Sequence, residues 1–236
     1  MVYGVVCHLS FLLGVLTMML AMLFGMSRSL GALTAPWSWI ANAALLIQFF
    51  AMHSLLLSAR GRSLLGRMAP PGTGVTLSTT TYVTVAAVQI FALFAFWSPS
   101  GTIWWQASGP VLVVMLVLYA VSWLLLGVAM VNAGLSVQSG SLGWIALLRG
   151  RKPVYPPMPV TGLFRFTRQP IYVAFTLTLW TVPVWTPDQL VVALTLTAYC
   201  VVAPRFKEAR FRRIYGLAFD DYAGRVRYWL PRLRNP

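Results

Sequence analysis

The stretch "GPVLVVMLVLYAVSWLLLGVAMVN", from Gly109 to Asn132, contains no charged residue. An uncharged apolar stretch of about 20 residues is long enough to cross the hydrocarbon core of a bilayer as an α-helix. This stretch lies inside a longer run, from Met68 to Leu148, that holds no Asp, Glu, Lys or Arg. The whole chain is 58% hydrophobic and only 9% charged, whereas about a quarter of the residues in ordinary soluble proteins are charged. The sequence therefore predicts an all-α integral membrane protein.

Six apolar segments are predicted to be transmembrane helices. They are residues 3–26, 36–58, 80–98, 109–132, 171–186 and 189–203. The first lacks the basic leader and the clear cleavage site of a signal peptide, so we interpret it as a retained span. The last two are short and are separated by Pro187 and Asp188, which predicts a short helical hairpin. Beyond Ala203, arginine alternates with aromatic residues, a pattern that predicts a C-terminal amphipathic cytoplasmic helix at the membrane surface.

The basic residues indicate how the chain is oriented. Fourteen of the 18 follow Leu148, in loops and a tail that flank apolar segments. Basic loops usually mark the cytoplasmic face, so we predict a multi-pass protein of a bacterial inner membrane with both termini in the cytoplasm. The net charge of +14 is then explained by contact with membrane lipid, and no nucleic-acid partner is expected. Cys7 and Cys200 lie in separate apolar segments, without metal-ligand spacing, so no metal site is predicted.

The chain is predicted to have two parts. Residues 1–132 would form a four-span N-terminal transmembrane bundle. Residues 133–236 would supply a cytoplasmic loop, the helical hairpin and the tail, which together would form a cofactor-binding module. The loop contains "KPVYPPMPVTG", with four prolines between Lys152 and Gly162, and so cannot be a regular helix. Long loops without structure of their own are usually functional.

Two polar residues leave alternatives open. Glu208 is the only glutamate in the chain and lies among basic residues. It could form an exposed pair with Arg212, four residues along a helix, or it could be a carboxylate that binds a cationic group of a ligand. His53 follows Asn42 and Gln48 in the second apolar segment. It could be a hydrogen-bonded histidine between helices or a substrate contact, since polar residues in spans face protein or a cavity.

Two motifs resemble a known family. "GLFRFTRQPIY" (Gly162–Tyr172) and "KEARFRRIYGLAFDDYAGRVRYWLP" (Lys207–Pro231) resemble the isoprenylcysteine carboxyl methyltransferase superfamily. Its pattern is Arg-His-Pro-x-Tyr, a hairpin, then Glu-Glu followed by Gly-x-x-Tyr-x-x-Tyr. Three shorter stretches are similar to the NnrU-like and methanethiol S-methyltransferase branch: "MHSLLLSAR" (Met52–Arg60), "TTTYV" (Thr79–Val83) and "WSP" (Trp97–Pro99). The resemblance covers roughly residues 45–236.

The resemblance implies S-adenosylmethionine as cofactor, bound at the cytoplasmic face. It implies catalytic roles for Arg168 and Glu208, the arginine by a carboxylate of the cofactor or by the substrate and the glutamate near the cofactor's ammonium. The implied cofactor-binding residues are Gly162, Thr167, Arg168, Gln169, Pro170, Tyr172, Glu208 and Tyr222. Backbone groups of the Arg168–Tyr172 loop would hold the adenine. His53 and Arg60 are the expected substrate contacts, and the acceptor would be a small or lipophilic thiol or carboxylate. The oligomeric state is left open.

Two positions depart from the family pattern. Gln169 replaces the family histidine, and Lys207 replaces the first glutamate. A non-catalytic membrane partner or assembly subunit that retains the methyltransferase fold is therefore the alternative to an enzyme, and a small-solute transporter is a third interpretation. Cofactor binding distinguishes the enzyme from both.

Overall fold

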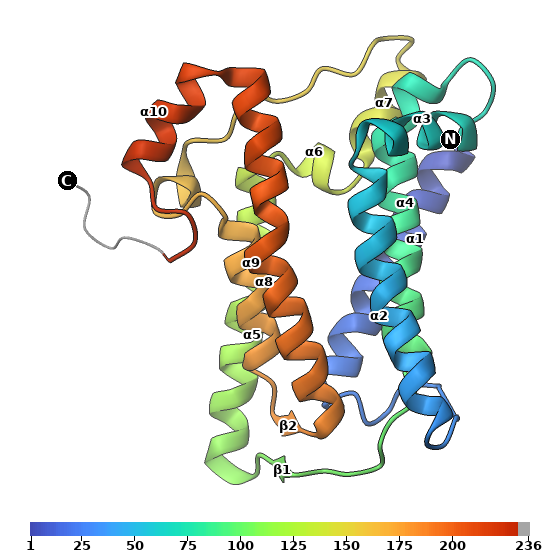
Figure 1. Ribbon diagram of the computed structural model, residues 1–236, viewed down its shortest axis with the longest axis vertical. Coiled ribbons are helices and arrows are strands. Elements are labelled where there is room, and N and C mark those ends of the chain that lie inside the picture. The colour runs from blue at the N-terminus through green and yellow to red at the C-terminus, as the bar shows by residue number, and fades with distance from the viewer. Residues whose placement is uncertain (231–236) are drawn as a thin grey trace. The chain divides into compact units, whose positions relative to one another are not determined.

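The computed structural model describes residues 1–230, and the regular structure of these residues is almost all helical (Figure 1). The helices are α1 (Val2–Leu23), α2 (Trp37–Leu56), α3 (Ala59–Met68), α4 (Gly74–Ala95), α5 (Gly109–Asn132), α6 (Leu135–Gln138), α7 (Ser141–Leu148), the 3-10 helix η1 (Gly162–Arg165), α8 (Pro170–Trp180), α9 (Pro187–Tyr215) and α10 (Leu217–Arg225). Two two-residue strands, β1 (Trp105–Gln106) and β2 (Val184–Trp185), pair with each other. The predicted all-α class is confirmed. Pro231, the last residue of the second family motif, lies outside the described residues.

Within residues 1–230, five helices are long and apolar enough to cross a membrane: α1, α2, α4, α5 and α9. The protein is therefore a multi-pass helical membrane protein. The fifth predicted segment, residues 171–186, is represented by α8, which has only 11 residues. At 1.5 Å per residue, α8 is about 16 Å long, roughly half the thickness of the hydrocarbon core. Six crossings therefore stay a prediction that depends on α8.

The sixth predicted segment differs from the structure in length. It was expected to end at residue 203, but α9 has 29 residues and continues through Pro204 to Tyr215. Proline lacks the N–H that would bond the carbonyl four residues earlier, which here belongs to Cys200. That carbonyl accepts a hydrogen bond from Trp229 Nε1 (3.3 Å) instead, and the next carbonyl, of Val201, accepts one from the Tyr228 hydroxyl (2.7 Å). Tertiary hydrogen bonds thus satisfy the helix where the proline interrupts it.

The predicted C-terminal amphipathic helix is therefore divided in two. Its first part is the end of α9 and its second part is α10. Gly216 separates them at φ +54°, a backbone conformation that glycine adopts without steric cost. Phe219 and Tyr222 of α10 are buried, so this helix has one apolar face directed into the protein.

The described chain divides into two compact units. The first comprises residues 1–105, 136–155 and 184–188. Its central helix is α4, which packs against α1, α2, α3 and α7. Gly14 of α1 allows a close approach, because a Cβ there would lie 2.7 Å from the carbonyl oxygen of Ala87. Small residues serve this purpose between membrane helices.

The second unit comprises residues 106–135, 156–183 and 189 onward. The four-span N-terminal bundle, which includes α5, stays a prediction. In the structure α5 packs against α8 and η1. The hydroxyls of Ser122 in α5 and Thr181 at the end of α8 are 3.1 Å apart, and Asn132 Oδ1 accepts a hydrogen bond from Leu163 N (2.8 Å). Hydropathy identified α5 as a span, but these side-chain contacts decide where it packs.

The predicted cytoplasmic loop, residues 133–168, is more ordered than expected. It contains α6, α7 and η1, whereas residues 152–160 have no regular structure. The prolines in "KPVYPPMPV" account for the irregular part, because each removes a backbone donor and fixes φ.

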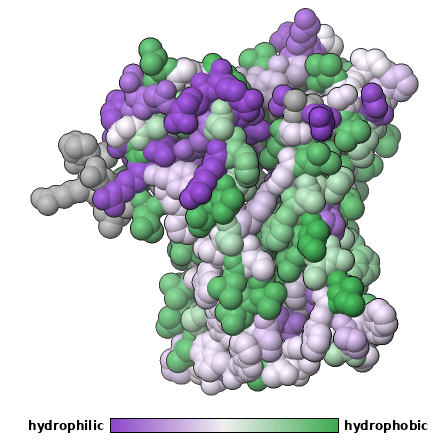
Figure 2. All heavy atoms as spheres, viewed as in Figure 1, coloured by the Kyte–Doolittle hydropathy of each residue, from purple (hydrophilic) through white to green (hydrophobic). Residues whose placement is uncertain are grey.

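The surface of the second unit has a hydrophilic region and an apolar region. Figure 2 shows hydrophilic residues gathered over α10 and the C-terminal part of α9. In contrast, apolar side chains of α5 are exposed, among them Val113 (61%) and Leu124 (70%). Exposed apolar side chains along a whole helix are expected where lipid, not water, surrounds it.

Candidate functional site

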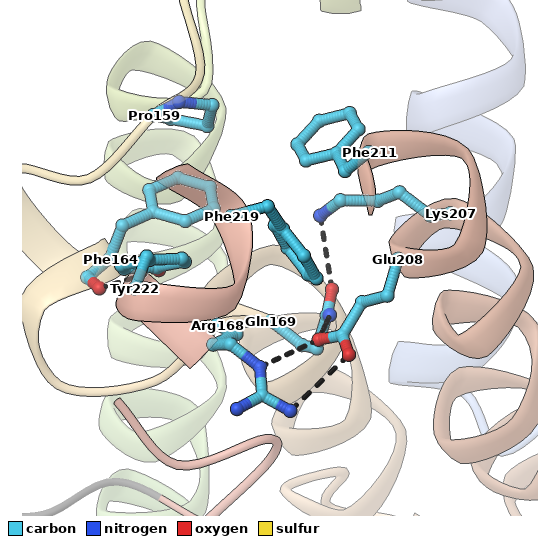
Figure 3. Close-up of a pocket in the computed structure, with 9 residues that line it drawn as sticks. All are labelled: Pro159, Phe164, Arg168, Gln169, Lys207, Glu208, Phe211, Phe219 and Tyr222. Carbon is cyan, nitrogen blue, oxygen red and sulfur yellow. Dashed lines mark hydrogen bonds and ion pairs between the residues drawn. The ribbon is translucent and has the colours of Figure 1, made fainter. Parts of the chain in front are cut away.

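Four polar side chains of the second unit form a continuous hydrogen-bonded chain (Figure 3). Arg168 and Gln169 immediately precede α8, and Lys207 and Glu208 lie on α9. Arg168 donates from Nε to Glu208 Oε1 (2.8 Å) and from Nη2 to Oε2 (3.2 Å). Gln169 Nε2 donates to Glu208 Oε1 (2.8 Å), and Lys207 Nζ donates to Gln169 Oε1 (3.0 Å). The structure thus brings together the two residues predicted to be catalytic and both positions that depart from the family pattern.

The backbone before α8 explains how this segment reaches α9. Pro170 is the first residue of α8, a position where its missing N–H is not needed. The Thr167 hydroxyl accepts from Gln169 N (3.2 Å) and donates to Trp229 O (2.8 Å). These contacts fix the turn, and the Gln169 side chain is directed inward, where the residue is only 1% exposed.

Arg168 is also bound to the segment around the end of α10. Its Nη1 donates to the carbonyl oxygens of Ala223 and Val226, both at 2.7 Å, and its backbone N donates to Arg227 O (2.9 Å). The sequence predicted that Arg168 offers a positive fork to a carboxylate. The fork is present, and in this structure the carboxylate it binds is that of Glu208.

The predicted exposed pair between Glu208 and Arg212 is not formed. Arg212 pairs instead with Asp220 (2.7 Å), and both of these side chains are about half exposed. Glu208 faces Arg168, and the side chains of that pair are only 14% and 12% exposed. A two-point ion pair shielded from water is favoured over an exposed one along a helix, because screening by water is weaker. The other interpretation, a carboxylate for a cationic ligand group, stays a prediction.

Aromatic residues surround the polar chain. Phe164 of η1, Phe211 of α9, and Phe219 and Tyr222 of α10 line the cavity beside it, together with Pro159 (Figure 3). The Tyr222 hydroxyl donates to Phe164 O (2.8 Å), and burial raises the pKa of Tyr222 above its ordinary value. Tyr222 is therefore a protonated donor that ties α10 to η1. The cavity volume is about 10 Å³, which is room for about one water molecule.

Lys207 makes contacts that its position in the sequence did not indicate. Its Nζ lies 5.7 Å from the ring centroid of Phe164, 5.8 Å from that of Tyr172 and 5.5 Å from that of Phe211. All three distances are within the roughly 6 Å range of cation–π attraction. The ammonium is thus held by three aromatic rings and by one amide oxygen.

Gly162, an expected cofactor-binding residue, has a structural reason for its identity. Its φ is +59°, and a Cβ there would collide with the Asn132 side chain. Glycine is required to start η1 close to α5. A cofactor role for Gly162, Thr167, Pro170, Tyr172 and Tyr222 stays a prediction.

The expected substrate residues belong to the first unit. His53 of α2 is hydrogen-bonded to α4, with 2.7 Å between its Nε2 and the Tyr82 hydroxyl, as the interhelical interpretation predicts. Arg60 is an exposed residue of α3. The substrate role of both stays a prediction.

Sequence reasoning did not assign Phe164 or Phe219 to the site. A signal was present for Phe219, because it lies three residues before Tyr222 and therefore on the same face of α10. Phe164 offered none, since its orientation depends on the 3-10 turn that Gly162 begins.

The comparisons with known proteins agree with the motifs. No family model and no solved structure matches the chain. The chain is 27% identical over 203 residues to a methanethiol S-methyltransferase of Pseudomonas deceptionensis, covering 85% of this chain and 76% of that protein. It is 26% identical over 240 residues to the methanethiol S-methyltransferase of Pseudomonas sp. (strain GM41(2012)), covering 98% and 90%. It is also 26% identical over 181 residues to Nurim of Sus scrofa, covering 73% and 66%.

Two of these relatives are named as methyltransferases, and the structure shows a helical membrane protein without indicating a reaction. The resemblance inferred from the two motifs is confirmed in this sense. The two methanethiol S-methyltransferases match this chain over 85% and 98% of its length.

Proposed function

We propose that this protein is a membrane methyltransferase that transfers a methyl group from S-adenosylmethionine to a small or lipophilic thiol or carboxylate. The observation that carries the proposal is the Arg168–Glu208–Gln169 cluster. Its members come from the two segments that resemble the methyltransferase motifs, and they meet at a shielded point among aromatic side chains. A small thiol is the favoured acceptor, since two of the relatives are named for methanethiol.

The chemistry of the site suits this cofactor. Glu208 Oε2 accepts from Arg168 at 3.2 Å, the longer bond of the pair, and a carboxylate oxygen can accept a further bond from the cofactor's ammonium. Arg168 supplies positive charge for a carboxylate of the cofactor or for an anionic acceptor. Phe219 and Tyr222 supply flat apolar surfaces for the adenine.

The space available is smaller than the cofactor. A cavity of about 10 Å³ compares with roughly 300–1,000 Å³ for small-molecule pockets. Binding therefore requires side chains of the cluster, or α10, to move. The N–H of Arg168 is bonded to Arg227 O and that of Gln169 to Thr167 Oγ1. Adenine binding through these groups therefore also requires the segment after α10 to release the first and the Thr167 hydroxyl to release the second.

The residues would act by position and charge more than by proton transfer. A sulfonium methyl donor needs alignment with the acceptor and exclusion of water. A thiol acceptor reacts as its thiolate, and the positive charge of Arg168 or Arg60 would favour that anion. A role of His53 in binding the acceptor is also a proposal.

The proposed topology has six crossings, with α8 as the short one, and both termini in the cytoplasm of a bacterial cell. The basic residues that follow α2, α5 and the apolar part of α9 support it, through the preference of basic loops for the cytoplasmic face. The cofactor would then reach the Arg168–Glu208 cluster from the cytoplasm.

Two measurements on detergent-purified protein test the proposal. Calorimetric titration with S-adenosylhomocysteine should give one site per chain. Incubation with methyl-labelled S-adenosylmethionine and methanethiol should give labelled dimethyl sulfide. Absence of binding at millimolar cofactor would reject the enzyme. The non-catalytic partner subunit would then replace it, an alternative that the small cavity and Lys207 favour.

A further inference from the structure

We propose that the Lys207 ammonium occupies a site that would otherwise bind the cationic group of a ligand. Phe164, Tyr172 and Phe211 form what we term the aromatic cage, and the Lys207 ammonium lies between their rings. A sulfonium ligand enters the cage only after the Lys207 side chain leaves, so Lys207 lowers the affinity for such a ligand. The inference rests on the proposed function only for the identity of the ligand, a sulfonium methyl donor.

The cage is built from three separate elements of the second unit. Phe164 belongs to η1, Tyr172 to the first turn of α8, and Phe211 to α9, four residues after Lys207. Positions four apart lie on the same face of a helix, so Phe211 and Lys207 project together. The centroid distances of 5.5 to 5.8 Å place one cation against all three rings at once.

A lysine ammonium is a poor match for this environment. It is strongly hydrated and carries three N–H donors, whereas the rings offer no strong acceptor. Among the described residues, Lys207 Nζ donates a hydrogen bond to Gln169 Oε1. A trialkyl sulfonium or a quaternary ammonium has no N–H to satisfy, and aromatic cages are the established means of binding quaternary ammonium cations. The cage therefore suits an alkylated cation better than it suits its present occupant.

Charge opposes joint occupancy. Arg168 and Lys207 contribute two positive charges and Glu208 one negative charge, so the cluster is already net positive. A second cation beside Lys207 would be repelled, because a like charge at a few ångströms in a poorly hydrated site is unfavourable. An uncharged thioether, such as the demethylated product, does not experience the charge repulsion.

The test uses the difference between a sulfonium and a thioether. Lys207→Met keeps an unbranched, flexible side chain that is one heavy atom shorter, and it removes the charge. Lys152→Met, at the only other lysine in the chain, is the matched control on an exposed loop of the first unit. Each purified variant is titrated calorimetrically with S-adenosylmethionine, S-adenosylhomocysteine and trimethylsulfonium. We expect Lys207→Met to bind both sulfonium compounds about tenfold more tightly than the natural protein, with less than about a threefold change for S-adenosylhomocysteine. Lys152→Met should match the natural protein.

A second substitution locates the effect in the cage. Phe211→Leu, added to Lys207→Met, keeps an apolar side chain but removes one π face. It should reverse most of the gain for trimethylsulfonium. If Lys207→Met does not fold, Lys207→Gln replaces it, since it too is uncharged.

The outcomes separate the cage from the proposed function. If the natural protein binds S-adenosylmethionine and neither Lys207 variant binds it more tightly, the inference is wrong and the methyltransferase proposal stands. If neither nucleoside ligand binds any variant, yet trimethylsulfonium binds Lys207→Met more tightly than the natural protein, the cage stands and the methyltransferase proposal fails. Equal gains for S-adenosylmethionine and S-adenosylhomocysteine, or no binding of trimethylsulfonium to a Lys207 variant at millimolar concentration, overturn the inference.

Discussion

The Arg168 guanidinium and the Glu208 carboxylate form a two-point ion pair, with bonds of 2.8 and 3.2 Å, between the start of α8 and the middle of α9. Forty residues separate the two in the chain, and the side chains are 14% and 12% exposed. Carbonyl groups around the end of α10 complete the coordination of the guanidinium. One pair therefore connects both segments that resemble the methyltransferase motifs, and it also reaches the end of α10.

Glu208→Gln is expected to destabilise the protein and to weaken cofactor binding. It leaves the shielded Arg168 charge without a counterion, which typically costs about 3–5 kcal/mol when a partner is removed, and less here because the amide oxygen still accepts a bond. Loss of a charge-assisted bond to the cofactor's ammonium would reduce affinity about tenfold to a hundredfold. Asp220→Asn, which breaks the exposed pair with Arg212, is the matched control and should leave the melting temperature almost unchanged. A Glu208 variant that melts lower but binds cofactor normally would limit Glu208 to a structural role.

Gln169→His is expected to leave cofactor affinity within about threefold, a difference of under 1 kcal/mol. Gln169 donates to Glu208 and accepts from Lys207, and a neutral imidazole also has one donor and one acceptor. Gln169→Leu removes both functions at a nearly fully buried position and should lower the melting temperature. Radiolabel transfer to methanethiol measures turnover in parallel. The natural protein could bind the cofactor and yet transfer no methyl group. If Gln169→His then restores transfer, the natural chain is a catalytically silent relative.

Gly162→Ala is expected to destabilise the protein for two separable reasons. The residue has φ +59°, and a Cβ would collide with the Asn132 side chain. Positive φ alone costs a non-glycine residue about 1–2 kcal/mol. Gly150 has φ +61°, and a Cβ added there would meet no atom within 4 Å, so Gly150→Ala isolates the backbone term. A melting temperature reduced equally by the two substitutions would show that Asn132 moves aside freely.

The six-span topology predicts which side of the membrane each loop occupies. In a chain with Cys7 and Cys200 replaced by alanine, single cysteines at Pro70, Tyr155 and Leu230 should react only with reagents that enter the cytoplasm. A cysteine at Ile103 should react with an impermeant reagent added from outside. Labelling of position 155 from outside would reject the topology and the cytoplasmic placement of the site.

The sequence was sufficient to predict the helical class and, to within one residue, the start of α8. Pro170 marks a helix start through its fixed φ, and long apolar runs define spans by length alone. The end of α9 could not be predicted, because the hydrogen bonds that compensate Pro204 come from Tyr228 and Trp229, far along the chain. Local spacing suggested Arg212 as the partner of Glu208, but burial beside α8 decided for Arg168. The packing of α5 depends on Asn132 and Ser122, and hydropathy does not report such contacts.

Residues 223–229 contact Thr167, Arg168 and the Cys200 carbonyl, which has lost its helical partner at Pro204. These contacts have a consequence for biosynthesis. The ribosome makes these residues after α9, the last of the predicted spans, so the site closes only once residues 223–229 have been made. A chain that stops after Tyr222 would insert all of its spans and yet lack the groups that hold Arg168 in place. Stop codons at positions 223 to 229 would therefore produce a membrane-inserted protein that lacks some or all of these contacts, and a protein fused after residue 230 needs a linker that leaves Trp229 free to dock.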